Sequence, residues 1–247
     1  MDTIATDTFS AKTLRLCALA GAASALSTLA LILLPEQFPA VETMADRAAR
    51  AASPLYRAYL LIYLVHPLLC LAAALAVAQQ VRRQAPQLAG LALLGFAAWA
   101  SAEFLQQCLS WVANIGLANA WSAPDASGRD TWTQLWPSYR LVWDALYLFL
   151  LYGFMLGNTA MALGLARGGA VQHWFGLAFG GAALLTLGLL SGEFGYPLPA
   201  GMFDWAYLVW QPAARLAVAL WLWRLAARAT PALSDGDAAT RGAAAGV

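Results

Sequence analysis

The stretch WASAEFLQQCLSWVAN, residues 99–114, lies inside an apolar run that is long enough to cross a membrane. At helical spacing, four of its polar residues fall on one face, because Glu103, Gln107, Ser110 and Asn114 follow the i, i+4, i+7, i+11 pattern. A carboxylate at that depth costs about 2.5–3.5 kcal/mol on insertion scales. The sequence therefore predicts that polar groups of other helices face Glu103.

The composition indicates that lipid is the solvent of this chain. Hydrophobic residues make up 61% of the 247 positions and charged residues only 11%, against about 25% charged in soluble domains. A net charge of +1 and the lack of a basic cluster argue against a nucleic-acid partner. The three cysteines lie in separate apolar runs and are interpreted as buried apolar residues rather than as a disulfide framework.

The apolar runs predict an all-α fold, a polytopic membrane bundle of six transmembrane helices in a single domain over residues 1–228. Each run has the roughly 20 residues that a bilayer core of about 30 Å requires. The segments at 35–53 and 120–138 are predicted to be loops, and residues 229–247 a disordered tail. The spans are placed at about 14–34, 55–81, 88–119, 139–166, 174–192 and 203–226.

The distribution of Lys and Arg orients the bundle. One set of helix ends carries more of these residues, among them Lys12, Arg82, Arg83, Arg167 and Arg224. The positive-inside rule places that set in the cytoplasm, so both termini are predicted to be cytoplasmic. We expect a multi-pass protein of the bacterial inner membrane, with membrane lipid as its surroundings.

With this orientation, polar side chains from several helices reach the same outer half of the membrane. We therefore predict an outward-facing polar and aromatic cavity with Glu103 at its floor, above a dry bundle of Leu, Ala and Gly. If the protein is an enzyme, Glu103 and Asp144 are the candidate catalytic acids. The candidate ligand-binding residues are Tyr59, Tyr63, His66, Trp99, Gln107, Trp111, Asn114, Trp143, Tyr147, Asp204, Gln211 and Arg215.

Several of these residues have a purely structural alternative. Glu103 could pair with Arg215 or accept a hydrogen bond from Tyr63, and Asp144 could pair with Arg140 one turn earlier. His66, which precedes Pro67, could be a satisfied core histidine. Asp204 and Glu193 could belong to the chemistry of the loop near the interface, and the tyrosines could serve packing alone.

Some chemistries have little support in the sequence. His66 and His173 are expected at opposite depths, which does not suit a bis-histidine haem. No Cys, Asp or Glu group accompanies them at the spacing of a zinc site, and nucleotide-binding or hydrolase motifs are absent. We therefore expect no metal and no cofactor. Small-residue faces such as Gly21/Ala25 and Gly153/Gly157 favour close helix packing and could bind a membrane-protein partner.

The chain also resembles a bacterial six-helix integral membrane family that is known only as a domain of unknown function. The resemblance rests on Leu55-Tyr56-Arg57 after an Ala-rich segment, on His173-Trp174-Phe175-Gly176 after Arg167, and on a final helix ending Trp221-Leu222-Trp223-Arg224. It implies a six-helix fold and no established activity. Glu103 and the Trp-rich segment at 120–138 depart from that pattern.

Three functions remain open. In the first, the outer cavity binds a lipidic or small apolar ligand with a polar head. In the second, the protein is an intramembrane enzyme in which Glu103 or Asp144 protonates a lipidic or isoprenoid substrate and aromatic rings stabilise a cation. In the third, it is a proton-coupled small transporter, although the sequence lacks the internal repeat that such carriers usually show.

Overall fold

The computed structural model describes residues 9–197 and 202–229, with the side chains of 202–207 excepted. The described residues form helices and no strand, which confirms the all-α prediction. The elements are α1 (Ala11–Leu33), the short 3-10 helix η1 (Leu34–Gln37), α2 (Met44–Ala52), α3 (Pro54–Arg82), α4 (Pro86–Ser122), α5 (Ser127–Leu165), α6 (Ala170–Glu193) and α7 (Met202–Ala229).

Five helical segments in the described ranges are long and apolar enough to cross a membrane: α1 together with η1, then α3, α4, α5 and α6. The chain is therefore a helical bundle of the multi-pass membrane type. The predicted sixth span, 203–226, coincides with α7, which is not among the five. The sixth crossing and the cytoplasmic termini stay predictions.

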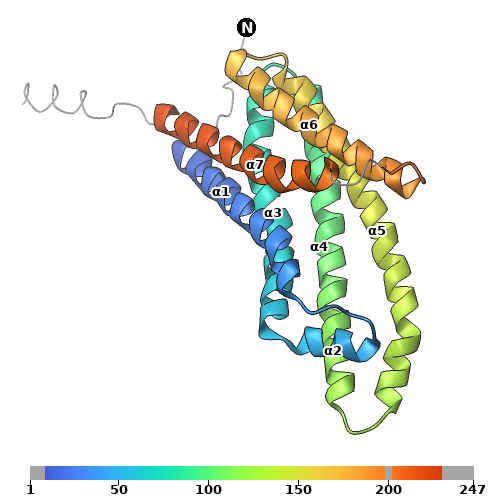
Figure 1. The fold of residues 1–247 in the computed structure, drawn as a ribbon. Coiled ribbons are helices and arrows are strands. Elements are labelled where there is room, and N and C mark those ends of the chain that lie inside the picture. The colour runs from blue at the N-terminus through green and yellow to red at the C-terminus, as the bar shows by residue number, and fades with distance from the viewer. Residues whose placement is uncertain (1–8, 198–201, 230–247) are drawn as a thin grey trace, which may run out of the picture.

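The helices α3, α4 and α5 run side by side as the centre of the bundle (Figure 1). α1 packs on α3, α7 packs along α1, and α6 packs on α5. The turns at 83–85 and 166–169 meet at one end, where Gln84 Nε2 donates a hydrogen bond of 3.1 Å to the Gly164 carbonyl. We call this the turn end. The opposite end, the α2 end, holds α2 and the turn at 123–126 (Figure 1).

Two segments differ from the sequence prediction. Residues 127–138, predicted as part of a loop, form the first turns of α5, and Pro137 lies inside that helix. A proline inside a helix removes one amide donor, and here α5 continues through it along α4, the most extensive helix pair of the molecule. The predicted loop at 35–53 contains η1 and α2. The predicted tail lies outside the described residues, except for Ala229.

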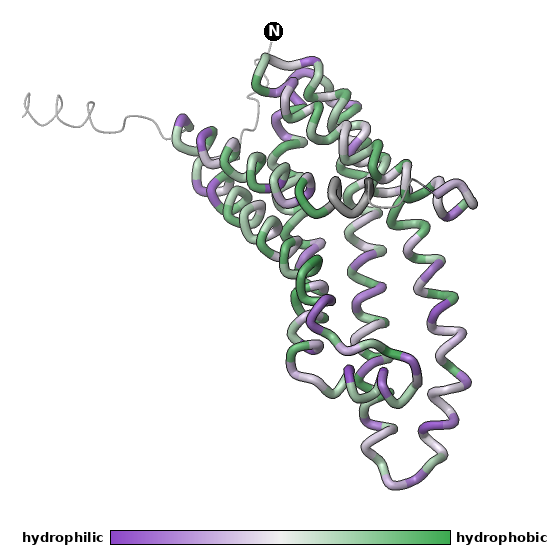
Figure 2. Tube along the Cα trace, in the orientation of Figure 1, coloured by the Kyte–Doolittle hydropathy of each residue, from purple (hydrophilic) through white to green (hydrophobic). Residues whose placement is uncertain are grey.

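Towards the turn end, α4 and α5 touch through glycines. A Cβ on Gly95 would collide with the backbone of Gly157, and a Cβ on Gly153 would lie 2.7 Å from the Trp99 amide nitrogen. Only residues without a side chain let two helix backbones approach so closely. An apolar core that includes Val77, Val81 and Leu165 surrounds this contact. Hydrophilic residues lie at the two ends of the bundle and also part-way along α4 and α5, as Figure 2 shows.

Candidate functional site

A polar cavity of about 150 Å³ opens at the α2 end, between α2, α3, α4 and α5. Three guanidinium groups line it, Arg47 and Arg50 from α2 and Arg140 from α5, so we call it the arginine chamber. The other lining residues are Tyr56, Tyr59, Leu60, Tyr63, Gln107, Ser110, Asn114, Trp136, Tyr139 and Trp143.

Local sequence signals place the two arginines of α2. Thr43 caps this helix by accepting a hydrogen bond of 3.1 Å from the Asp46 amide, and the Asp46 carboxylate accepts one of 2.8 Å from the Thr43 amide. This reciprocal capping box fixes where α2 begins. The hydrogen bonds that the Thr43 hydroxyl and amide donate to Asp46 lower the pKa of its carboxyl below the usual value. Ala48 and Ala51 are then buried, while Arg47 and Arg50 stay half-exposed.

The walls of the arginine chamber are held by polar and aromatic contacts. Ser110 Oγ and the Tyr139 hydroxyl are 3.0 Å apart and join α4 to α5. The Arg47 guanidinium lies 5.2 Å from the centroid of the Trp136 ring, and that of Arg50 lies 5.1 Å from the Tyr56 ring. Such cation–π contacts hold the guanidinium groups over the rings.

A second cavity, of about 80 Å³, lies deeper between α3, α4, α5, α6 and α7, and we call it the Glu103 cavity. Glu103 is only 5% exposed, and the charged group whose field acts on it is Arg215, which lines the same cavity. The one ion pair among the described residues is a different one, between Arg140 and Asp144. The remaining lining residues are Tyr63, His66, Trp99, Gln106, Tyr147, Leu150, Leu151, Phe154, Thr186 and Leu189.

The polar residues beside the Glu103 cavity form a chain across three helices. His66 Nδ1 lies 2.8 Å from the Ser27 hydroxyl, and His66 Nε2 lies 3.4 Å from Cys70 Sγ. Arg215 Nη1 in turn donates to Cys70 Sγ. His66 is thus a buried histidine with partners at both ring nitrogens, as its structural alternative requires, and Arg215 is held by a thiol.

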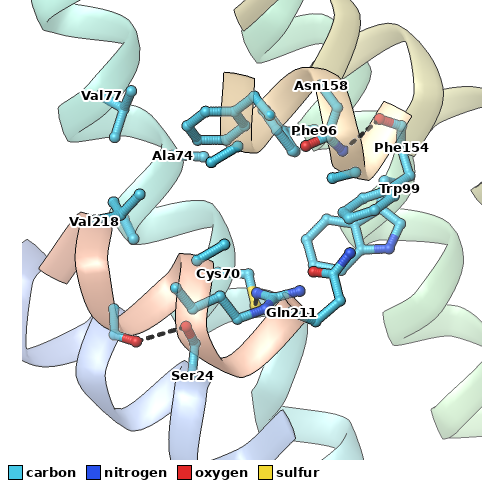
Figure 3. A pocket seen from close by; sticks show the side chains of 17 residues that line it. Ser24, Cys70, Ala74, Val77, Phe96, Trp99, Phe154, Asn158, Gln211 and Val218 are labelled. Atoms are coloured by element: carbon cyan, nitrogen blue, oxygen red, sulfur yellow. Dashed lines mark hydrogen bonds between the residues drawn. The ribbon is translucent and has the colours of Figure 1, made fainter. Parts of the chain in front are cut away.

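The third cavity, of about 70 Å³, has a mostly apolar lining, and we call it the Gln211 cavity (Figure 3). Gln211 is 4% exposed and lies beside Trp99 in Figure 3. In the described part of the chain, neither its Nε2 nor Arg215 Nε has a hydrogen-bond partner. The lining residues are Gly21, Ser24, Cys70, Ala73, Ala74, Val77, Phe96, Trp99, Phe154, Asn158, Ala178, Phe179, Ala182, Gln211, Ala214, Arg215 and Val218.

The three cavities adjoin one another through shared walls. Tyr63 belongs both to the arginine chamber and to the Glu103 cavity. Trp99, Phe154 and Arg215 belong both to the Glu103 cavity and to the Gln211 cavity. The lining is therefore cationic and hydroxyl-rich at the α2 end, mixed in the Glu103 cavity and mostly apolar in the Gln211 cavity.

Most of the sequence-predicted site residues lie on these walls. Tyr59, Tyr63, Gln107, Asn114 and Trp143 line the arginine chamber, with Tyr63 shared. His66, Trp99, Glu103, Tyr147 and Arg215 line the Glu103 cavity, and Gln211 lines the cavity named after it.

Three predicted residues have other places. Asp144 bonds to Arg140 at 3.2 Å, and the two side chains are 57% and 52% exposed. Trp111 is half-buried in α4 and does not belong to the walls of the three cavities that the described residues form. Asp204 lies in α7, but its side chain is outside the described set.

Sequence reasoning missed Arg47, Arg50, Tyr139 and the cysteine–histidine contact. The signal that could have found α2 is the spacing of Thr43 and Asp46, a capping box ahead of a helix with alanines on one face. No group of three His, Cys, Asp or Glu able to hold a metal ion occurs within residues 9–197 and 202–229. Comparison of the chain with protein-family models, curated proteins and solved structures gives no match.

Proposed function

We propose that the protein is a multi-pass membrane protein that binds a lipidic or small apolar ligand inside its bundle, in the Glu103 and Gln211 cavities. The observation that carries the proposal is the buried amide of Gln211, whose Nε2 has no hydrogen-bond partner among the described residues. A buried donor without a partner costs about 1–3 kcal/mol. A polar group of a ligand in the Gln211 cavity satisfies it.

The lining of the Gln211 cavity supports an apolar ligand. Four aromatic rings and several small or aliphatic side chains line it, and its polar side chains include Asn158, Gln211 and Arg215; the rings are those of Phe96, Trp99, Phe154 and Phe179. Ligand sites of this kind are mostly apolar, with few polar groups that fix orientation. Gln211 and Arg215 are such groups for the inner end of the ligand, and Glu103 is one for its middle.

The orientation belongs to the proposal. Arg82, Arg83 and Arg167 lie at the turn end, next to the bond between Gln84 and Gly164. The positive-inside rule places that end in the cytoplasm, so the arginine chamber faces the outside of a bacterial inner membrane. Labelling of single cysteines placed at Ser127 and Gln84 tests this, and labelling of the Gln84 position from outside contradicts it.

The experiment for ligand binding is native mass spectrometry of the protein purified in a mild detergent. We expect a bound lipidic molecule in the wild type and its loss in Ala182→Leu, since Ala182 is buried and lines the Gln211 cavity. Gly90→Leu is the matched control, because nothing lies within 4 Å of a Cβ at that position. The proposal fails if the wild type carries no ligand and binds no added one, or if both folded variants keep the same ligand.

Acid catalysis by Glu103 is the second candidate, and one observation favours it. Glu103 lines the same cavity as the rings of Trp99 and Phe154, and ring faces stabilise a cation. A carboxylic acid in that cavity would protonate a double bond of an isoprenoid chain, and the resulting carboxylate would then take a proton from a carbon beside the cation, which shifts the double bond and restores the acid. Incubation in D₂O then places deuterium in the bound lipid of the wild type and none in that of Glu103→Gln, while both proteins retain the lipid. Equal deuterium in the two proteins contradicts catalysis by Glu103.

A further inference from the structure

The arginine chamber carries positive charge that the described residues do not neutralise. Arg140 alone forms an ion pair, with Asp144. The carboxylate nearest in sequence to Arg47 is Asp46, and it accepts hydrogen bonds from the Thr43 amide and hydroxyl and from the Glu42 amide. The guanidinium groups of Arg47 and Arg50 lie over the rings of Trp136 and Tyr56, and Arg50 also hydrogen-bonds to the Tyr56 side chain. Because a guanidinium carries five N–H donors, both arginines keep donors for an anion in the cavity.

The depth of the chamber suits a head group. About twenty helical residues cross the bilayer core, and counting twenty from the turn end reaches Tyr63 in α3, Leu105 in α4 and Leu146 in α5. The chamber lies at and beyond these positions, at the level of the lipid head groups. The exposed pair of Arg140 and Asp144 agrees with that level, because ion pairs do not face hydrocarbon.

The size of the chamber and its inner wall narrow the ligand further. Its volume of about 150 Å³ is roughly ten times the 10–15 Å³ that a cavity needs to hold one water, which is room for a carboxylate or a phosphate. Its inner wall is Tyr63, which also lines the Glu103 cavity. This one side chain separates an anion among the arginines from the inner cavity, so a chain that enters the bundle passes where Tyr63 turns aside.

We propose that Arg47, Arg50 and Arg140 bind the anionic head group of an amphiphile whose chain enters the Glu103 cavity. This inference rests on the proposed function and adds the class of ligand. Planar guanidinium groups form paired hydrogen bonds with phosphate and carboxylate oxygens. The hydroxyl of Ser110 and the tyrosines of the chamber supply further donors.

The test uses two probes that share a chain and a phosphate and differ only in the choline group. Hexadecyl phosphate and hexadecylphosphocholine are titrated onto the full-length protein in phosphatidylcholine nanodiscs, and bound adducts are counted by native mass spectrometry. We expect the wild type to bind hexadecyl phosphate about tenfold more tightly, and Arg47→Gln/Arg50→Gln to lose that preference. The double variant Arg47→Lys/Arg50→Lys keeps the positive charge and should retain part of the preference for hexadecyl phosphate. Arg83→Gln, an exposed arginine at the turn end, keeps all of it.

The outcomes separate this inference from the proposed function. Equal binding of the two probes by the wild type, or an unchanged preference in the folded Gln double variant, overturns the head-group assignment. If the head-group assignment is overturned in this way, loss of both probes in Ala182→Leu still supports the proposed ligand site in the inner cavities. Absence of binding of either probe to the wild type overturns both proposals. A third arm uses inorganic phosphate alone: if it binds as tightly as hexadecyl phosphate, the chamber is a site for a free anion and the amphiphile is wrong.

Discussion

The two halves of the α4–α5 pair are built from different residues and enclose different space. Near the turn end, Gly95, Gly153 and Gly157 bring the helix backbones into contact. Near the α2 end, Trp136, Tyr139 and Trp143 of α5 line the arginine chamber together with Gln107, Ser110 and Asn114 of α4. The difference teaches that residue size at the helix interface decides where this bundle is closed and where it holds a cavity.

We call the part of the α4–α5 pair near the turn end the glycine half and the part near the α2 end the chamber half. The largest expected effect on stability is in the glycine half. In Gly95→Leu the new side chain meets the backbone of Gly157, which cannot move without displacing α5. We expect a loss of about 1–3 kcal/mol or more of stability, as overpacking costs in a tight core. Thermal unfolding in detergent, followed by circular dichroism, measures it.

The matched control for this variant is Gly90→Leu, one and a half turns earlier on α4, where a Cβ meets nothing within 4 Å. Its unfolding temperature should match that of the wild type. Because leucine favours a helix more than glycine does, a propensity effect would not lower the stability of either variant, and equal losses in the two would contradict close packing as the reason for Gly95.

A smaller effect is expected at Gly116, on the same helix but in the chamber half. A Cβ there would collide with the ring of Trp132, a side chain that can turn aside, and not with backbone. Gly116→Ala should therefore lower the unfolding temperature by less than Gly95→Ala does, and should change the tryptophan fluorescence. A larger loss at Gly116 than at Gly95 contradicts the contrast between the two halves.

Residue periodicity predicted which side chains of α4 share a face. The face formed by Glu103, Gln107 and Asn114 could be foreseen, because a helix fixes which side chains share a side, and the structure puts all three on cavity walls. Which groups meet across helices could not be foreseen. Arg215 could have paired with Glu103, yet it donates to Cys70, and that choice depends on the distance between helices.

The α2 end was predicted less well, for a local reason. Pro137 and the polar residues around it resemble a loop, but packing along α4 keeps residues 127–138 helical. The charged residues at 35–53 led to the prediction of a loop there, although the segment contains α2. This helix is only nine residues long and begins with a capping box. Tertiary contacts override weak local preferences in such short or interrupted segments.

The smallest expected effect is a response to acid pH at the α2 end that the glycine contact of α4 and α5 does not share. Hydrogen bonds from Thr43 lower the pKa of Asp46, so the ionised form is favoured in the folded protein. Its contribution to the position of α2 is complete above the ordinary aspartate pKa of about 3.9 and is lost as the pH falls through the lower folded value.

The glycine half, without a titrating group at its contact, should not change over that range. The fluorescence of Trp136, over which Arg47 stacks, should therefore shift below about pH 4 in the wild type. Asp46→Asn, which keeps an oxygen acceptor but cannot titrate, should remove the shift, and Glu42→Gln, whose side chain lies outside the capping box, should retain it. A shift that survives in Asp46→Asn would show that another group, and not the cap of α2, responds to acid at this end.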